Sequence, residues 1–208
     1  TVACIAGGVL GATWGLSAVP LSWRRMVHGW PGLNDRGLVE LTAGILGRDE
    51  GEWPLMNHFD YTGYGDISSW AVHPHDSGVV LAAVGAVTTP DPRAVDVTAV
   101  VSLCRMGRDD MPLPNVDAKN WIQVPLVDSP NGNAHTQFLV DQAADAIAEF
   151  RAEGHRVLVH CVQAMSRTPS IAARYSVRHR GIDSDTALRD VCGALPLSSP
   201  KPFLVECI

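Results

Sequence analysis

The chain has 208 residues and a mass of 22.3 kDa; 46% of its residues are hydrophobic and 18% are charged. This apolar content is enough for a folded core and excludes a disordered chain. The formal net charge of −6 argues against a broad nucleic-acid-binding surface, so any bound anion must be held by a local site. The five cysteines form no CxxC pair, which disfavours a disulfide scaffold or structural zinc and favours a reducing, cytoplasmic compartment.

The first 23 residues form the most membrane-like stretch. The chain opens without an initiator Met and ends in the apolar run PFLVECI, so we expect a fragment of a longer polypeptide. Residues 1–23 carry no charge, and Gly7, Gly11 and Gly15 follow the four-residue spacing of closely packed helices. Pro20 interrupts the run, and neither a basic start nor a cleavage site is present. We therefore expect a glycine-faced, buried helix of an all-α domain, not a membrane span.

Two more helices are expected in this segment, Leu21–His28 and Asn34–Leu46, the latter with Asn34 as its N-cap. The segment contains the stretches TVACIAGGVLGATWGLSAVP and WRRMVHGWPGL. It resembles the C-terminal end of ADP-ribosylglycohydrolases of the DraG type. In that family, paired aspartates and a threonine bind two metal ions; Thr1 would match the threonine, and the aspartates would precede it. The resemblance covers residues 1–46 and implies a remnant without hydrolase activity.

The rest of the chain predicts an α/β fold. Residues 47–65 have no sustained period and read as a linker, after which strands alternate with helices over 66–208. That alternation is typical of a mostly parallel central sheet flanked by helices. The expected strands are Asp66–Val72, Gly78–Val87, Val97–Cys104, Trp121–Val127 and Arg156–His160; the expected helices are His135–Glu153, Thr168–Arg180 and Ser184–Leu195.

The segment VLVHCVQAMSRTPS, residues 157–170, carries the chemistry. A short apolar strand ends at Cys161, five residues follow, and Arg167 then precedes a helix with Thr168 as cap. Inward-facing N–H groups of such a loop, together with the helix dipole, form an anion cradle. Arg167 can bind two phosphate oxygens with its planar fork. The same field stabilises a thiolate, so Cys161 is the expected nucleophile.

This motif resembles the HCx5R(S/T) signature of the cysteine-dependent protein tyrosine phosphatases, and its SRT ending resembles the dual-specificity branch. The resemblance covers residues 66–208 and implies a reaction without metal or other cofactor. It also implies that Cys161 forms a phosphocysteine, Arg167 binds the phosphate, Thr168 stabilises the leaving thiolate and His160 orients the loop. The intervening residues are expected to bind substrate: Val162, Gln163, Ala164, Met165 and Ser166.

One loop position departs from the family. Ala164 stands where the family usually has glycine, three residues after the cysteine. If the backbone there has a positive φ, alanine is strained by about 1 kcal/mol or more, which bears on the rate more than on the fold.

A phosphatase also needs a general acid that protonates the leaving oxygen. Asp128, in VPLVDSP, follows an expected strand, and this stretch resembles the family's acid loop. The alternative is a turn or cap aspartate. Asp109 and Asp110 are expected in a solvated loop near the site. Cys104 is expected to be a buried small hydrophobe, and could resolve an oxidised Cys161 only if the two lie close together.

The favoured function is therefore hydrolysis of phosphomonoesters. The expected partner is a phosphorylated protein or another phosphomonoester, with neither nucleic acid nor membrane, and the oligomeric state stays open. Three alternatives remain: a rhodanese-type sulfurtransferase, a phosphate-binding pseudophosphatase, and an ADP-ribosylglycohydrolase activity in a longer parent chain only.

Overall fold

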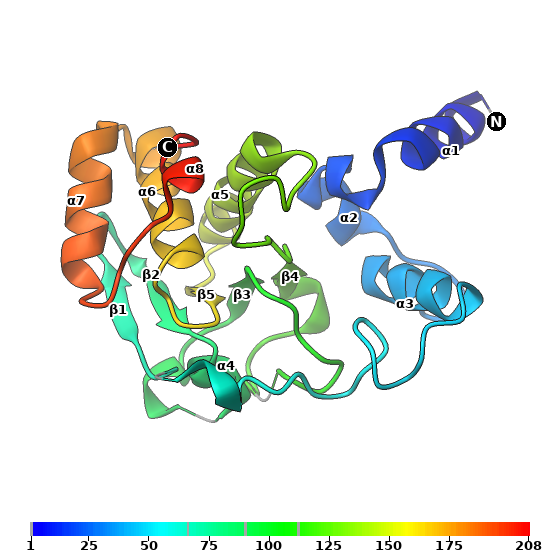
Figure 1. Cartoon of the computed structure of the whole chain (residues 1–208), viewed down its shortest axis with the longest axis horizontal. Helices are drawn as coiled ribbons and strands as arrows, with labels where there is room; N and C mark the ends of the chain where they lie inside the picture. Colours follow the sequence, from blue (N-terminus) through cyan, green and yellow to red (C-terminus); the bar gives the residue numbers. More distant parts are fainter. Residues whose placement is uncertain (1, 66, 90, 112) are drawn as a thin grey trace.

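The computed structural model describes residues 2–65, 67–89, 91–111 and 113–208. Within these ranges, five strands form one sheet in the order β1-β2-β5-β3-β4. Strand β1 is antiparallel to β2, and the other neighbours are parallel, as predicted (Figure 1). The strands are β1 (Trp70–His73), β2 (Asp76–Ala83), β3 (Ala99–Ser102), β4 (Trp121–Gln123) and β5 (Val157–Cys161).

Helices cover both faces of this sheet (Figure 1). The larger core lies between the sheet and the helices α5 to α8, and a smaller one lies on the face covered by α4. These helices are α4 (Gly85–Thr88), α5 (Thr136–Ala152), α6 (Arg167–Arg180), α7 (Ser184–Ala194) and α8 (Pro202–Val205). Short 3-10 turns lie at Leu16–Ala18, Thr62–Tyr64, Pro92–Ala94 and Ala118–Asn120.

Strand β5 lies at the centre of the sheet, which explains its uninterrupted apolar sequence. All five of its residues are buried between β2 and β3. Val157, Val159 and Cys161 face the larger core, whereas Leu158 faces the core beneath α4. Burial on both faces is what makes a parallel central strand apolar throughout. The strand therefore places Cys161, its last residue, in the buried interior at the carboxyl end of the sheet.

Strand β2 is shorter than predicted, because the chain turns into α4 after Ala83 instead of continuing to Val87. The Gly85 N–H donates to the carbonyl oxygen of Ile67 at 3.2 Å. A Cβ atom at this glycine would lie 2.4 Å from that oxygen, so this close approach requires glycine. The local apolar pattern of the sequence carries no sign of this contact.

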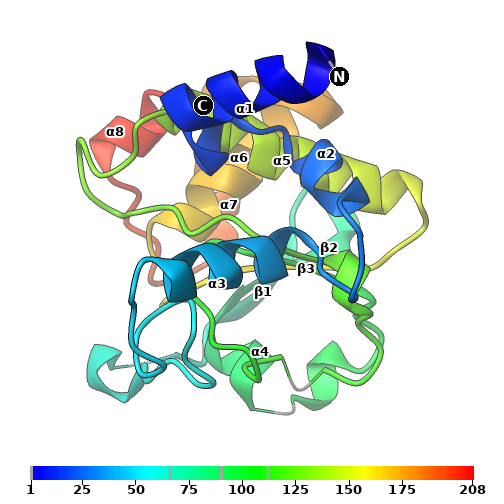
Figure 2. The ribbon, with the colours of Figure 1, turned by 90° about the vertical axis from the view of Figure 1, so that its right-hand side faces the viewer.

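The N-terminal segment contains the helices α1 (Val2–Trp14), α2 (Leu21–Met26) and α3 (Asp35–Ile45), which lie on the same side of the molecule (Figure 2). Asn34 caps α3 as predicted, since its side chain accepts the Gly37 N–H at 2.9 Å. Within the described ranges, none of the helices is long and apolar enough to cross a membrane.

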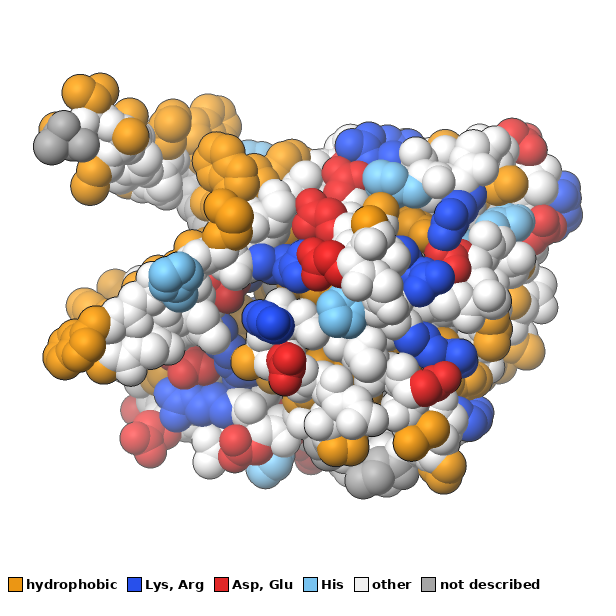
Figure 3. Space-filling view, turned by 180° about the vertical axis from the view of Figure 1, so that it is seen from behind, with side chains coloured by type: hydrophobic (Ala, Val, Ile, Leu, Met, Phe, Trp, Pro, Cys, Tyr) orange, Lys and Arg blue, Asp and Glu red, His pale blue; other side chains and the backbone are white. Residues whose placement is uncertain are grey.

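The prediction that the opening helix is buried is wrong. Helix α1 has no buried residue and projects from the body of the molecule with its apolar side chains uncovered (Figure 3). Val2 is 81% exposed and Ile5 is 71% exposed. Cβ atoms added at Gly7 or Gly11 would meet nothing within 4 Å, so no described part of the chain packs on the glycine face.

Helix α2, in contrast, is part of the folded body. Leu21 is 3% exposed and belongs to the larger core, and its N–H donates to Gln142 Oε1 at 2.9 Å. The Arg25 guanidinium lies 4.3 Å from the centre of the Phe150 ring and forms an ion pair with Glu153 at 2.8 Å. Burial of Leu21 and these polar contacts attach α2 to α5.

Two histidines, the buried His73 and the half-buried His75, join the β1–β2 turn to α6. His73 is 2% exposed; its Nε2–H donates to the Ala172 carbonyl at 3.1 Å, and its Nδ1 accepts the His75 N–H at 3.0 Å. His75 contacts Ser176 and Asp190 at 2.9 and 3.2 Å. Burial, followed by the neighbouring charge of His75, lowers the pKa of His73 to about 4 despite the bond to Ala172.

This burial predicts an acid-sensitive fold. Between pH 6.5 and about 4, the unfolded chain binds a proton at His73 that the folded chain does not, so the free energy of unfolding falls as the pH drops. The slope that one such proton contributes is at most about 1.4 kcal/mol per pH unit. We expect His73→Gln to flatten urea unfolding midpoints over this range, whereas His28→Gln, at an exposed position, leaves the slope unchanged. An unaltered slope in His73→Gln would contradict the assignment.

Candidate active site

The loop predicted to bind an anion joins the end of β5 to the start of α6. Cys161 ends the strand and is 2% exposed. Helix α6 begins at Arg167, with Ser166 as the N-cap residue, so the prediction that Thr168 is the cap is wrong. The helix starts one residue earlier than predicted because the backbone is already near the helical conformation at Ser166, with φ −118° and ψ −66°. Thr168 lies inside the first turn, fully buried.

Arg167 joins the loop to the ends of two other strands. Its Nη1 donates to the carbonyl oxygens of Leu103 and Leu126, each at 3.0 Å. These residues follow β3 and β4, so one guanidinium nitrogen connects three segments. The Nε atom of Arg167 is buried without a hydrogen-bond partner among the described residues, and so is the Thr168 hydroxyl. Two buried donors at the end of the loop thus lack an acceptor in the described part of the chain.

Ala164 has a positive φ, the conformation in which alanine is strained. Its φ is 58°, in the left-handed region, and the residue is 1% exposed. An L-residue in this conformation costs roughly 1–2 kcal/mol relative to the right-handed one. The loop therefore keeps the backbone path that normally uses glycine, at an energetic cost.

His160 is held neutral inside the fold. Its Nε2 lies 2.6 Å from the Ser102 hydroxyl, which in turn accepts the Trp121 indole N–H at 2.9 Å. Burial is the main cause that lowers the pKa of His160 to about 3, against a hydrogen bond to the Cys161 backbone and with the Arg167 charge adding to the effect. This set of bonds assigns the proton to Nδ1 and leaves Nε2 as the acceptor. The sequence contained no signal for Ser102 or Trp121 as partners.

Asp128 lies beside the loop, as predicted, although 38 residues separate it from Ser166. The Ser166 hydroxyl donates to Asp128 Oδ1 at 2.9 Å. Lys201 places its Nζ 3.8 Å from the same carboxylate oxygen and 2.6 Å from the backbone oxygen of Asp128. The carboxyl group is 27% exposed, so it can reach a bound substrate. Sequence reasoning missed Lys201, which only the return of the chain after α7 brings here.

The remaining loop residues alternate between buried and half-buried side chains. Val162 and Ala164 are buried, whereas Gln163 and Met165 are half-buried. The Gln163 amide donates to the Tyr64 carbonyl, and the Met165 carbonyl accepts the Ser199 N–H at 2.6 Å. Both ends of the loop are thus supported by segments distant in the sequence.

Two neighbouring predictions have different outcomes. Cys104 is buried, as expected, and burial raises the pKa of its thiol to about 12, with the Cys161 charge adding to the effect. Asp110, expected in a solvated loop, is 5% exposed. Its carboxylate accepts the N–H groups of Phe59 and Gly107 at 2.8 and 2.6 Å. Asp110 therefore attaches residues of the expected linker to the loop after β3.

Comparison with known proteins decides the family. The model of the dual specificity phosphatase catalytic domain matches residues 81–202, more than half of the chain. The chain belongs to this family. The matched region contains β3, β5, the loop after β5 and α6, and so includes Cys161, Arg167 and Asp128.

Individual relatives are distant. The chain is 28% identical to mouse dual specificity phosphatase 28 over 105 residues, covering 50% of this chain and 63% of the relative. It is 28% identical to Arabidopsis thaliana dual specificity protein phosphatase 1 over 132 residues, covering 63% of this chain and 64% of the relative. The chain thus spans less than two thirds of either relative.

The fold also matches solved structures. A mouse putative dual specificity phosphatase complexed with zinc tungstate superposes with a TM-score of 0.57 at 21% identity, over 69% of this chain and 85% of that one. At this identity the match shows a shared fold.

The φ of Ala164 generates a prediction for this family member. Ala164→Gly removes the left-handed penalty of roughly 1–2 kcal/mol and loses one buried methyl group worth about 0.8 kcal/mol. We expect the free energy of unfolding to rise by up to about 1 kcal/mol. Ala172→Gly, a buried helical position in α6, is the matched control and should destabilise the protein. Destabilisation by both variants in urea unfolding would contradict the strain.

Proposed function

We propose that this chain is a cysteine-dependent phosphatase that hydrolyses phosphomonoesters, phosphotyrosine and phosphoserine or phosphothreonine of proteins among them. The observation that carries the proposal is the pair of unpaired buried donors, Arg167 Nε and the Thr168 hydroxyl, on the loop that follows Cys161. A buried donor without a partner costs about 1–3 kcal/mol. A tetrahedral phosphate seated in the loop would supply the acceptor for Arg167 Nε, and the Cys161 thiolate would supply the one for Thr168. Membership in the family supports the same conclusion.

In the proposed reaction, Cys161 Sγ attacks phosphorus, an S–P bond forms and the P–O bond to the leaving group breaks. Asp128 gives its proton to the leaving oxygen. Water then attacks the phosphocysteine, with Asp128 now accepting its proton, and inorganic phosphate and the thiolate are released. Arg167 binds the equatorial oxygens, and the loop N–H groups face the charge that develops there.

The positioning groups support each step. Because two carbonyls hold Nη1 of Arg167, the guanidinium would bind the phosphate without first losing side-chain conformational entropy. Thr168, at the first turn of α6, offers its hydroxyl to the thiolate as it leaves. Neutral His160 fixes the backbone of Cys161 instead of adding a charge. The loop residues Val162 to Ser166 surround the phosphate through their backbone.

A phosphate-binding pseudophosphatase remains the second candidate, and the left-handed Ala164 is the observation that favours it. A strained loop can bind an oxyanion in a geometry that slows attack. The retained nucleophile, arginine and acid favour turnover.

The remaining proposals concern context. We propose an α-helical segment at 1–46, a linker at 47–65 and the phosphatase domain at 66–208, with the first resembling an ADP-ribosylglycohydrolase remnant. Thr1, the residue matched to that family's metal site, lies outside the described residues. The five cysteines are all free, which fits the reducing cytoplasm that we propose.

The nucleophile is tested by substitution at Cys161. We expect Cys161→Ser to abolish hydrolysis of an aryl phosphate while binding of orthovanadate is retained, because the cradle consists of backbone and Arg167. Arg167→Lys keeps the charge but loses the planar fork, and should weaken both binding and turnover. Cys192→Ser, at a half-buried cysteine outside the loop, is the matched control. Wild-type turnover in Cys161→Ser would exclude the mechanism; vanadate binding without turnover in the wild-type chain would favour the pseudophosphatase.

The acid is tested by leaving-group dependence. Asp128→Asn should lower the rate on phosphotyrosine by about 10²–10⁴-fold, the usual contribution of a positioned acid. On an activated aryl phosphate the loss should be smaller, because a good leaving group needs less protonation. Asp185→Asn, at an exposed carboxylate in α7, should leave both rates unchanged. Equal losses on both substrates would assign the proton transfer to another group.

A further inference from the structure

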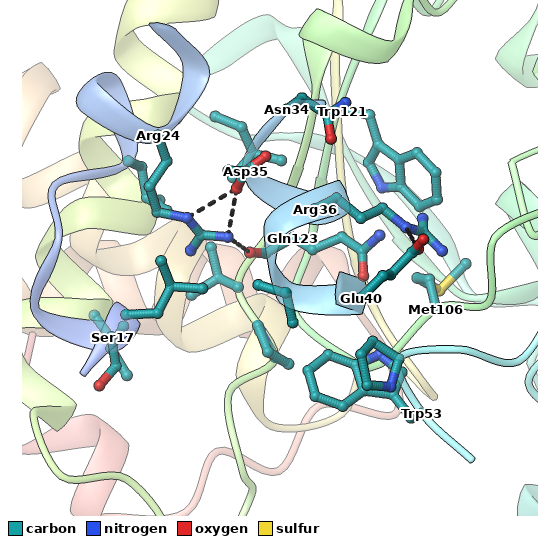
Figure 4. A pocket seen from close by; sticks show the side chains of 18 of the residues that line it. Ser17, Arg24, Asn34, Asp35, Arg36, Glu40, Trp53, Met106, Trp121 and Gln123 are labelled. Atoms are coloured by element: carbon teal, nitrogen blue, oxygen red, sulfur yellow. Dashed lines mark hydrogen bonds and ion pairs between the residues drawn. The ribbon is translucent and has the colours of Figure 1, made fainter. Parts of the chain in front are cut away.

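A cavity of about 820 Å³ lies between the N-terminal segment and the β4 side of the domain (Figure 4). Helices α2 and α3 form one wall, and β4 with the following loop forms the other. Neither Asp128 nor any residue from His160 to Thr168 lines it, so the candidate catalytic residues lie outside this cavity. Its volume falls in the range of roughly 300–1,000 Å³ that is typical of small-molecule sites, which often form between structural units.

The wall of this cavity is mainly apolar. Leu21, Val39, Val124 and Leu139 contribute aliphatic surface, and the indoles of Trp53 and Trp121 lie toward the end where Met106 is found (Figure 4). An apolar wall of this kind binds the hydrocarbon or aromatic body of a ligand by removing it from water.

Charge on the wall is predominantly positive, although the chain carries a net charge of −6. Five basic and two acidic residues line the cavity: Arg24, Arg25, Arg36, Arg108 and Lys119, and Asp35 and Glu40. Arg24 is matched by Asp35 at 2.8 Å, and Arg25 by Glu153 at 2.8 Å. These pairs neutralise one end of the cavity.

The other end keeps an excess positive charge. Glu40 accepts from both Arg36 Nε, at 2.9 Å, and Arg108 Nε, at 3.1 Å, so one carboxylate faces two guanidinium groups. The Nη2 atom of Arg36 is buried and has no hydrogen-bond partner among the described residues. Its guanidinium lies 5.0 Å from the centre of the Trp121 ring. A buried cationic donor without an acceptor is the complement of an anionic group.

We propose that this cavity binds an amphiphilic monoanion, an acyl chain with one carboxylate. The carboxylate would accept from Arg36 Nη2 and complete the charge balance around Glu40. The acyl chain would extend along the aliphatic wall, away from Arg36 and toward the end of the cavity near Ser17 (Figure 4). The apolar wall provides the affinity, and Arg36 selects the acid over a neutral analogue.

The test is calorimetric titration of the full chain with dodecanoate and with dodecanol, below the concentrations at which they aggregate. The Cys161→Ser variant is used, so that the result does not depend on the proposed phosphatase activity. We expect saturable dodecanoate binding to a single site. Quenching of tryptophan fluorescence should follow the same curve, because Trp53 and Trp121 line the cavity.

Substitutions then locate the site. Arg36→Met keeps an apolar stem and removes the charge, and should weaken dodecanoate binding by about tenfold or more but dodecanol binding by less than about threefold. Arg48→Met, at an exposed arginine shortly after α3 that does not line the cavity, is the matched control and should change neither. Val39→Trp fills the cavity and should weaken both ligands. Thermal melting by circular dichroism checks that each variant is folded.

Three results would overturn the proposal. Dodecanoate could fail to bind, or Arg36→Met could weaken both ligands equally, which would make this arginine only a structural partner of Glu40. Binding could also be lost in Val9→Ser, on exposed α1, while Val39→Trp keeps it; the amphiphile would then sit on that helix instead.

Discussion

The bonds from Arg167 to the carbonyl oxygens of Leu103 and Leu126 are the contacts on which the rest of the site depends. They join the start of α6 to the segments that follow β3 and β4, and so attach the loop after β5 to that edge of the sheet. Burial of this guanidinium requires partners, and the parallel strands provide carbonyls at the same edge. The two carbonyls thus fix the position of the guanidinium, whose Nε is buried without a hydrogen-bond partner among the described residues.

The loop itself is locally unfavourable. It contains a left-handed alanine, Ala164, and leads into two buried donors at the start of α6 that have no partner in the part of the chain that the structure describes. Such features persist only where the surrounding structure determines them. Here the loop lies between the fully buried strand β5 and helix α6, and His160, held by Ser102, forms a hydrogen bond with the backbone of Cys161. Stability of the core thus maintains a loop whose free donors match an oxyanion.

Much of the fold could be predicted from the sequence, because hydrophobic periodicity and turn residues are local signals. The succession of strands and helices along the chain, the mostly parallel sheet and helices α5, α6 and α7 follow from it. The exposure of α1 could not be predicted, because the sequence of an apolar helix does not show whether another part of the chain covers it. Helix α2 finds that surface through Leu21, whereas α1 does not. The cavity beside α2 and α3 arises from the same incomplete packing of the N-terminal segment.

For the candidate site, the sequence alone identified the loop from Cys161 to Arg167 as the candidate. Cys161 and Arg167 lie within one short strand–loop–helix unit, whose geometry depends on neighbouring residues. Tertiary structure alone decided which distant groups complete it. Ser102 meets His160 across 58 residues, and Lys201 meets Asp128 across 73. No local pattern encodes these contacts, because they exist only where the parallel strands and the returning chain place separate segments at one edge of the sheet.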